Sequence, residues 1–388
     1  MKTLKPAIVA GFIFLIQTAF AQSISRIVPA AERTGEYFPL LVNKKVALVG
    51  NQTSMIGQVH LLDSLISIGI KVIKIFSPEH GFRGNADAGE KISNATDSKT
   101  GIRIISLYGR NHKPKRSDLS DVDIILFDIQ DVGVRFYTYI STLHYVMEAC
   151  AEDGKPLIVL DRPNPNGFYI DGPLLDLKYR SFVGLHPVPV VYGMTIGEYA
   201  LMINGEKWLK NGVQCNLTVI KCTGYTHKSR YVLPVKPSPN LPDMQAVYFY
   251  PSLGLFEGTA ISIGRGTNFP FQVFGHPQLS NMQFTFVPEA TPGTTEPLYK
   301  GQTCYGVDLR NFKPDNDSDL FTLKWLIYAY KNFPDKTNFF NTFFRNLSGN
   351  NQLQNQIIQG MTESEIKKSW KQDIDKFKNV RSKYLIYQ

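Results

Sequence analysis

The sequence is poor in cysteine. It has four among 388 residues, none in a C-x-x-C pair and none spaced with histidine as zinc ligands are. Cys215 and Cys222 flank a predicted strand, so a disulfide between them is one possibility in an oxidising compartment, and four free buried thiols are the other. The cysteines therefore predict neither a metal site nor a thiol-based mechanism.

Several short motifs that mark common enzyme classes are also missing. There is no G-x-x-x-x-G-K-[ST] phosphate loop and no G-x-G-x-x-G after a strand, which argues against nucleotide binding. The G-x-S-x-G nucleophile elbow and the H-E-x-x-H zinc motif are absent as well. We therefore expect no organic cofactor and no metal.

Long apolar runs are confined to the N-terminus. The segment MKTLKPAIVAGFIFLIQTAFAQ combines two lysines, an apolar run and Ala19-Phe20-Ala21, which is the pattern of a secretory signal. The run is too short for a comfortable membrane span, and no cysteine at the cleavage point is available to carry a lipid. We expect residues 1–21 to be a signal peptide and the mature protein to be exported, periplasmic or secreted, without a membrane anchor.

The charge balance is modestly positive. The net charge is +9, and it falls to +7 without residues 1–21, which carry two lysines and no acid. Scattered positive charge fits a polyanionic substrate, but it is more often a property of an ordinary soluble basic protein. No nucleic-acid motif is present, and export argues against such a partner. The sequence gives no indication of the oligomeric state.

Apolar strands alternate with amphipathic helices in the first half of the chain. The predicted strands are 45–50, 70–76, 123–131 and 156–161, and the predicted helices are 59–69 and 136–154. This alternation is typical of an α/β fold with a parallel sheet. We predict a Rossmann-like domain over residues 22–230 that carries the active-site cleft. Beyond it, a segment rich in Pro, Gly and aromatics and then helical predicts a smaller C-terminal α+β domain over 231–388.

Each predicted strand is followed by polar residues. These are Asn51, the Glu79–His80 pair, Asp131, and Arg162 with Asn164. In open α/β sheets, ligands bind outside the carboxyl ends of the strands because the loops converge there. We therefore predict that these side chains surround one cleft.

Three carboxylates are candidates for catalysis. Glu79 leaves a strand in FSPEHGFRG, where Glu, His and Arg crowd a Gly-rich loop; a helix cap or a surface ion pair is the structural alternative. Asp131, in DIQDVGVRFYTY, has the same alternative of capping a helix. Glu257, in GLFEGTA, has glycine and apolar neighbours, and such surroundings raise the pKa of a carboxyl group and suit a general acid.

Three kinds of function fit these residues. Two facing carboxylates and many aromatic side chains fit a glycosidase. A metal cluster of Glu79, His80, Asp128 and Asp131 fits a metal-dependent hydrolase, although no compact pair of histidine ligands exists. The third possibility is a sugar-binding protein without turnover. Arg83 either pairs with Asp87 or Glu90 or binds an anionic ligand.

Several longer strings match a known family. FSPEHGFRG…DAGE, DIQDVGVRFYTYI, VLDRPNPNG…DGPLL, PSPNLP and FEGT…GRGT…PF resemble the exported bacterial exo-β-N-acetylmuramidases. The resemblance covers roughly residues 30–388. It implies a glycoside hydrolase that releases N-acetylmuramic acid from the non-reducing ends of peptidoglycan fragments, with Glu79 as the catalytic residue.

The substrate contacts are expected from the same strings. Arg83, Arg162 or Arg265 would clamp the lactyl carboxylate, because arginine pairs with carboxylates in a bidentate manner. The full set of expected substrate-binding residues is Asn51, His80, Arg83, Arg135, Tyr137, Arg162, Asn164 and Arg265. The chain departs from the family pattern at Ile263, where relatives often have Glu, and at Tyr192, where they often have His.

Overall fold

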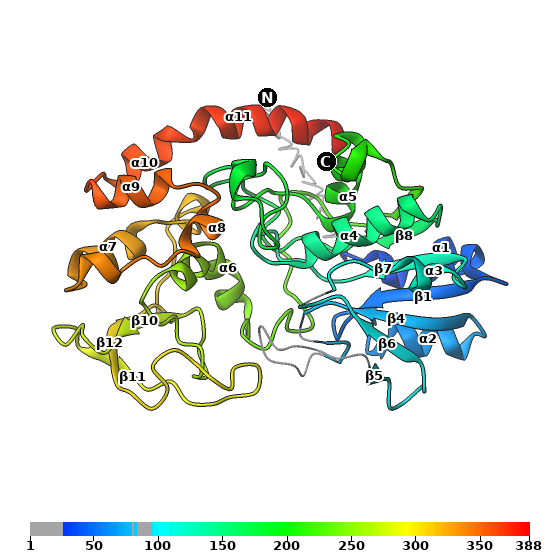
Figure 1. Ribbon diagram of the computed structural model, residues 1–388, viewed down its shortest axis with the longest axis horizontal. Helices are drawn as coiled ribbons and strands as arrows, with labels where there is room; N and C mark the ends of the chain where they lie inside the picture. Colours follow the sequence, from blue (N-terminus) through cyan, green and yellow to red (C-terminus); the bar gives the residue numbers. More distant parts are fainter. Residues whose placement is uncertain (1–25, 80, 84–94, 110) are drawn as a thin grey trace, which may run out of the picture.

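The computed structural model describes residues 26–79, 81–83, 95–109 and 111–388 (Figure 1). The predicted signal peptide, residues 1–21, and His80 lie outside the described residues. Within them, no helix is long and apolar enough to span a membrane.

The core of the first part is a seven-stranded sheet in the order β5-β6-β4-β1-β7-β8-β9. Its strands are β1 (Lys45–Gly50), β4 (Lys71–Ser77), β5 (Ala95–Thr96), β6 (Arg103–Ser106), β7 (Ile124–Asp128), β8 (Leu157–Leu160) and β9 (Leu217–Ile220). Only β5, at one edge, pairs antiparallel. Every residue of β7 and β8 is buried, as expected for parallel strands covered on both faces. The predicted α/β fold with a parallel sheet is confirmed.

Helices cover both faces of this sheet (Figure 1). Alternate residues of β1 show the two faces: Val46 and Leu48 pack with α1 (Thr34–Leu41) and α2 (Leu61–Ser67). Ala47 and Val49 belong to the cluster that includes α4 (Tyr139–Glu152) and α5 (Ile196–Gly205). The smaller elements of this part are β2 (Met55–Ile56), β3 (Val59–His60) and α3 (Arg116–Leu119).

The C-terminal part has a three-stranded antiparallel sheet and a layer of helices. The strands β10 (Val273–His276), β11 (Phe284–Phe286) and β12 (Cys304–Asp308) lie in the order β10-β12-β11. The helices are α6 (Met244–Leu253), α7 (Lys324–Asn332), α8 (Phe344–Ser348), α9 (Gln352–Ile358), α10 (Glu363–Ser369) and α11 (Lys371–Arg381). One buried cluster contains side chains from β7, α4, α6, α8 and α10, so the two parts share a core.

The end of the chain returns to the first part. Helix α11 runs back toward α5 (Figure 1), and Arg381 donates to the carbonyl of Gly193. Beyond it, the Tyr387 hydroxyl donates to Asp161 Oδ2 at 2.6 Å, directly after β8.

The four cysteines are free and buried, so the possible Cys215–Cys222 disulfide is not formed. Cys215 lies before β9 and Cys222 lies after it, so the two cysteines stand at opposite ends of an extended segment. Seven residues of extended chain span roughly 20 Å, far beyond the reach of a disulfide.

A buried arginine joins the two parts of the molecule. Arg135 is fully buried, and its guanidinium donates to the carbonyls of Pro173 at 2.7 Å, Val188 at 2.8 Å and Leu347 at 2.7 Å. Leu347 belongs to α8, which ends at Gly349 with a φ of 80°. A Cβ on Gly349 would lie 2.7 Å from Arg135 Nη2, so glycine is needed both for this turn and for the close approach.

Arg135→Met should destabilise the fold by about 3 kcal/mol, because it leaves three buried carbonyls without a donor at about 1 kcal/mol each. Urea unfolding measures this loss. Arg116→Met is the matched control, since that arginine is 92% exposed. Equal stability of the two variants would show that Arg135 does not join the two parts.

Candidate active site

A cavity of about 250 Å³ lies where the carboxyl edge of the sheet meets the C-terminal part. Glu79 reaches it from the loop after β4 and Tyr108 from the loop after β6. From the other side it is lined by Glu257, next to α6, and by Arg265. Of the residues after the strands that were predicted to surround one cleft, only Glu79 lines this cavity among the described residues, and Tyr137, Glu257 and Arg265 join it there.

Two hydroxyl groups hold the carboxylate of Glu79. Thr138, the N-cap of α4, donates from Oγ1 to Glu79 Oε2 at 3.0 Å, and the Tyr108 hydroxyl also hydrogen-bonds Glu79. Burial, followed by the negative charge of Glu79, raises the pKa of Tyr108, so its hydroxyl stays protonated and donates. These two hydrogen bonds fix the position of the Glu79 carboxylate at the cavity.

Sequence reasoning missed Tyr108. The run IRIISLYG contains β6 and ends in Tyr-Gly, so the rule that polar residues follow strands applies to it. This short strand was not among the predicted ones, and Tyr108 was missed with it.

Glu257 and Arg265 form an ion pair at the cavity wall. Arg265 donates to Glu257 Oε1 from Nε at 3.0 Å and from Nη2 at 2.6 Å. Glu257 therefore has a permanent positive charge beside it as well as the apolar neighbours expected from the sequence, and its role as a general acid stays a prediction. Arg265 Nη1 is buried and has no hydrogen-bond partner among the described residues.

Aromatic side chains form much of the remaining wall. The rings of Tyr137 and Tyr250 meet edge to face at 5.8 Å, and Tyr250 meets Phe271 at 4.9 Å. The Tyr137 hydroxyl donates to the carbonyl of Pro237 at 2.7 Å, which fixes the ring. A fixed aromatic wall offers a flat surface to the apolar face of a sugar ring.

Asp131 lies near the cavity but does not line it. It is 3% exposed; Oδ2 accepts from the Gly133 N–H at 2.7 Å and from the Tyr192 hydroxyl, whereas Oδ1 has no partner among the described residues. Burial raises the pKa of Asp131 to about 6.

The two departures from the family pattern have different surroundings. The hydroxyl of Tyr192, where relatives often have His, donates a hydrogen bond to Asp131. Ile263, the other departure, is buried in the apolar core.

Four other expected substrate-binding residues have structural partners instead. Arg162 pairs with Asp128 at 2.6 and 2.8 Å, and Arg83 pairs with Asp97 at 3.0 Å. Asn164 donates to the carbonyl of Met194, and Arg135 bonds three carbonyls as described above. None of these four side chains lines the cavity. A resemblance between sequence motifs does not show whether a polar side chain binds a ligand or stabilises the fold. For this reason the sequence alone led to the prediction that these four residues bind substrate.

Asn51 also lies away from the cavity lining. Its Oδ1 accepts from the Thr53 N–H at 2.9 Å and from Thr53 Oγ1 at 2.6 Å. In the described part of the chain, no group of three His, Cys, Asp or Glu side chains could hold a metal ion. Of the metal cluster considered from the sequence, Asp128 is engaged by Arg162 and His80 lies outside the described residues.

Asp131 should make stability depend on pH. Its folded pKa of about 6 is above the ordinary value of 3.8, so the folded state prefers the protonated form. That preference is fully present below pH 3.8 and is lost as the pH rises through 6. Wild type should therefore lose roughly 3 kcal/mol relative to Asp131→Asn between pH 3.8 and 7. Urea unfolding of both proteins across this window measures the difference, and a constant difference would contradict the buried carboxyl group.

Comparison with known proteins shows the family of the chain. The family model described as exo-beta-N-acetylmuramidase NamZ, N-terminal, matches residues 46–245, and its C-terminal counterpart matches residues 248–387. The peptidoglycan beta-N-acetylmuramidase NamZ of Bacillus subtilis (strain 168) is 39% identical over 374 residues, which cover 91% of this chain and 89% of that protein.

Two crystal structures of DUF1343 family proteins from Bacteroides fragilis NCTC 9343 have the same fold. One has a TM-score of 0.88 and 47% identity, the other a TM-score of 0.79 and 31% identity. Each match covers 94% of this chain and 99% of the other. The chain therefore belongs to the NamZ family of exo-β-N-acetylmuramidases.

Proposed function

We propose that this protein removes N-acetylmuramic acid from the non-reducing ends of peptidoglycan fragments, with Glu79 as the general acid. The main support for this role of Glu79 is its position: it lines the cavity, and its carboxylate is hydrogen-bonded by Thr138 and Tyr108. The cavity volume of about 250 Å³ lies just below the usual range for small-molecule sites, roughly 300–1,000 Å³. A cavity of this size suits one terminal sugar residue better than a long glycan chain. Such a size supports exo action.

The second catalytic group is proposed from the remaining charges. Among the described residues, Glu79 and Glu257 are the two carboxylates that line the cavity. Glu257 lies at the cavity wall against the Arg265 guanidinium, and its proposed role is to activate water or to stabilise the positive charge that develops on the sugar. The 2-acetamido group of the substrate is the alternative nucleophile. Asp131 remains a weaker candidate, because it does not line the cavity.

Arg265 is proposed to recognise the lactyl carboxylate of N-acetylmuramic acid. Arg265 lines the cavity; Glu257 accepts from its Nε and Nη2, and its buried Nη1 has no partner among the described residues. A carboxylate is the acceptor that gives such a donor its strongest hydrogen bond.

We also propose that the enzyme works outside the cytoplasm, periplasmic or secreted, after removal of residues 1–21. The N-terminal pattern of lysines, apolar run and Ala19-Phe20-Ala21 supports this location. N-terminal sequencing of the protein recovered from its native host tests it.

Glu79→Gln should bind the disaccharide of N-acetylmuramic acid and N-acetylglucosamine but turn it over at least about a hundredfold more slowly, because the amide cannot donate the proton. Release of monosaccharide measures the rate. The loss should be smaller for a phenyl glycoside with an activated leaving group, which needs less protonation. Near-normal hydrolysis of the disaccharide would assign the acid role to another residue.

Arg265→Met should weaken the binding of free N-acetylmuramic acid by about 10- to 100-fold, corresponding to a lost charge-assisted hydrogen bond of about 1.5–3 kcal/mol. N-acetylglucosamine lacks the lactyl group, so its binding should change little. Titration calorimetry measures both affinities.

The substitution also leaves Glu257 without its partner, and this charge would repel an anionic sugar. Glu257→Gln/Arg265→Met removes that repulsion and is the matched control. If the double variant regains wild-type affinity for N-acetylmuramic acid, Arg265 makes no direct contact with the carboxylate.

A further inference from the structure

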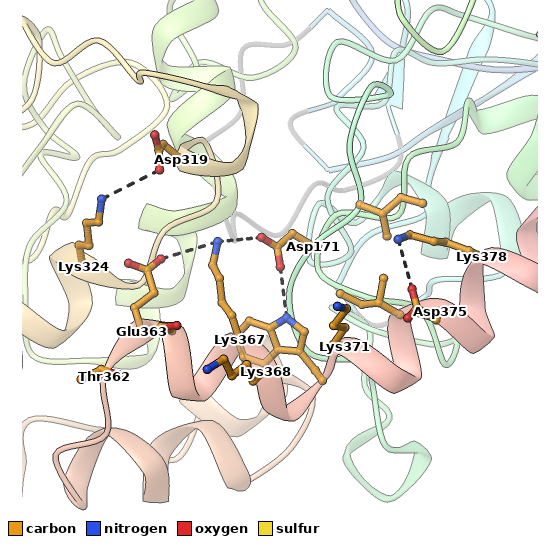
Figure 2. Close-up of a pocket in the computed structure, with 14 residues that line it drawn as sticks. Asp171, Asp319, Lys324, Thr362, Glu363, Lys367, Lys368, Lys371, Asp375 and Lys378 are labelled. Atoms are coloured by element: carbon orange, nitrogen blue, oxygen red, sulfur yellow. Dashed lines mark hydrogen bonds and ion pairs between the residues drawn. The ribbon is translucent and has the colours of Figure 1, made fainter.

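A second, larger cavity lies away from the active site. It is an open groove of about 760 Å³ between α10, α11 and the segment that carries Asp171 (Figure 2). At one end of the groove lie Asp319, from the 3-10 turn before α7, and Lys324, the first residue of α7. The groove shares no lining residue with the active-site cavity.

The floor of the groove is apolar and held in place. Trp370 is 5% exposed, and its Nε1 donates to Asp171 Oδ1 at 3.2 Å. Lys367 donates to the other oxygen of Asp171 at 2.8 Å, so this carboxylate is fully engaged. Ile374, one turn along from the indole, is also buried and lines the groove. The floor is therefore formed before any ligand arrives.

The rim carries more positive than negative charge. Three of its five lysines are paired with acids of the same groove: Lys324 with Asp319 at 4.0 Å, Lys367 with Asp171, and Lys378 with Asp375 at 3.4 Å.

The two remaining lysines, Lys368 and Lys371, are exposed and form no ion pair with any described residue. In Figure 2 no dashed line joins either of them to another residue of the groove. They flank Trp370 in the sequence. Two free ammonium groups thus stand beside a buried apolar floor.

We propose that this groove binds the acidic peptides that peptidoglycan carries, an inference that rests on the proposed function. Such a peptide brings carboxylates for Lys368 and Lys371 and small apolar side chains for the floor at Trp370 and Ile374. The volume lies in the range of about 300–1,000 Å³ typical of sites for molecules of that size. Two sites on one polymer raise its local concentration at the catalytic cavity.

The test is cosedimentation with insoluble peptidoglycan, either intact or stripped of its peptides by an amidase. Lys368→Glu/Lys371→Glu should bind intact material roughly tenfold more weakly than wild type, because two attractions become two repulsions. The affinity of wild type should be lower by a similar factor for stripped peptidoglycan than for intact peptidoglycan. The affinity of Lys368→Glu/Lys371→Glu should be nearly the same for both materials. Lys44→Glu/Lys71→Glu is the matched control, with the same charge change on exposed lysines at the amino edge of the sheet.

A second measurement separates the groove from the active site. Hydrolysis of the free muramyl disaccharide should be the same in wild type and in Lys368→Glu/Lys371→Glu, since a small substrate does not reach the groove. If Lys368→Glu/Lys371→Glu and the control Lys44→Glu/Lys71→Glu bind intact peptidoglycan equally well, the proposal is overturned. So would a defect of Lys368→Glu/Lys371→Glu that persists on stripped material, which would indicate an anionic wall polymer. If wild type binds as expected but hydrolyses no disaccharide, the groove stands and the proposed function fails.

Discussion

The active site depends on how the Arg135 guanidinium holds the two parts of the chain together. The catalytic cavity belongs to neither part alone, since Glu79 comes from the sheet edge and Glu257 and Arg265 come from the segment after α6. Arg135 bonds a carbonyl of α8 and two carbonyls of the first part, and Leu347, one of its partners, also lines the cavity. This buried charge has carbonyl acceptors for its Nη1 and Nη2 atoms in place of a carboxylate, so the three carbonyls around it have little freedom to move.

Within that frame, the two carboxylates of the cavity have different surroundings. Glu79 accepts hydrogen bonds from neutral hydroxyls, whereas Glu257 faces a permanent positive charge. Enzymes that need an acid and a charged partner at one pH obtain them by giving similar side chains different neighbours. The different roles proposed for Glu79 and Glu257 rest on this difference between their neighbours.

The sequence predicted the parallel sheet and the edge at which the cavity lies, because both depend on local patterns. Glu79 could be found in this way, since the strand before it is apolar and the loop is polar. Arg135 and Arg162 could not be assigned, because their partners lie 212 and 34 residues away in the chain. Glu257 and Arg265 are only eight residues apart, but nothing in the pattern shows that they pair. Tyr108 was missed because β6 has four residues, too few for a clear pattern.

The contact between Tyr387 and Asp161 has a consequence for the order of assembly. The two residues are 226 positions apart, and Tyr387 is the next-to-last residue of the sequence. At about 5–20 residues per second, a ribosome needs on the order of 10–45 s to add that length. During this delay Asp161 lacks the Tyr387 hydroxyl as a hydrogen-bond donor. The contact therefore forms late, because Asp161 gains this hydrogen-bond donor only after a further 226 residues have been added.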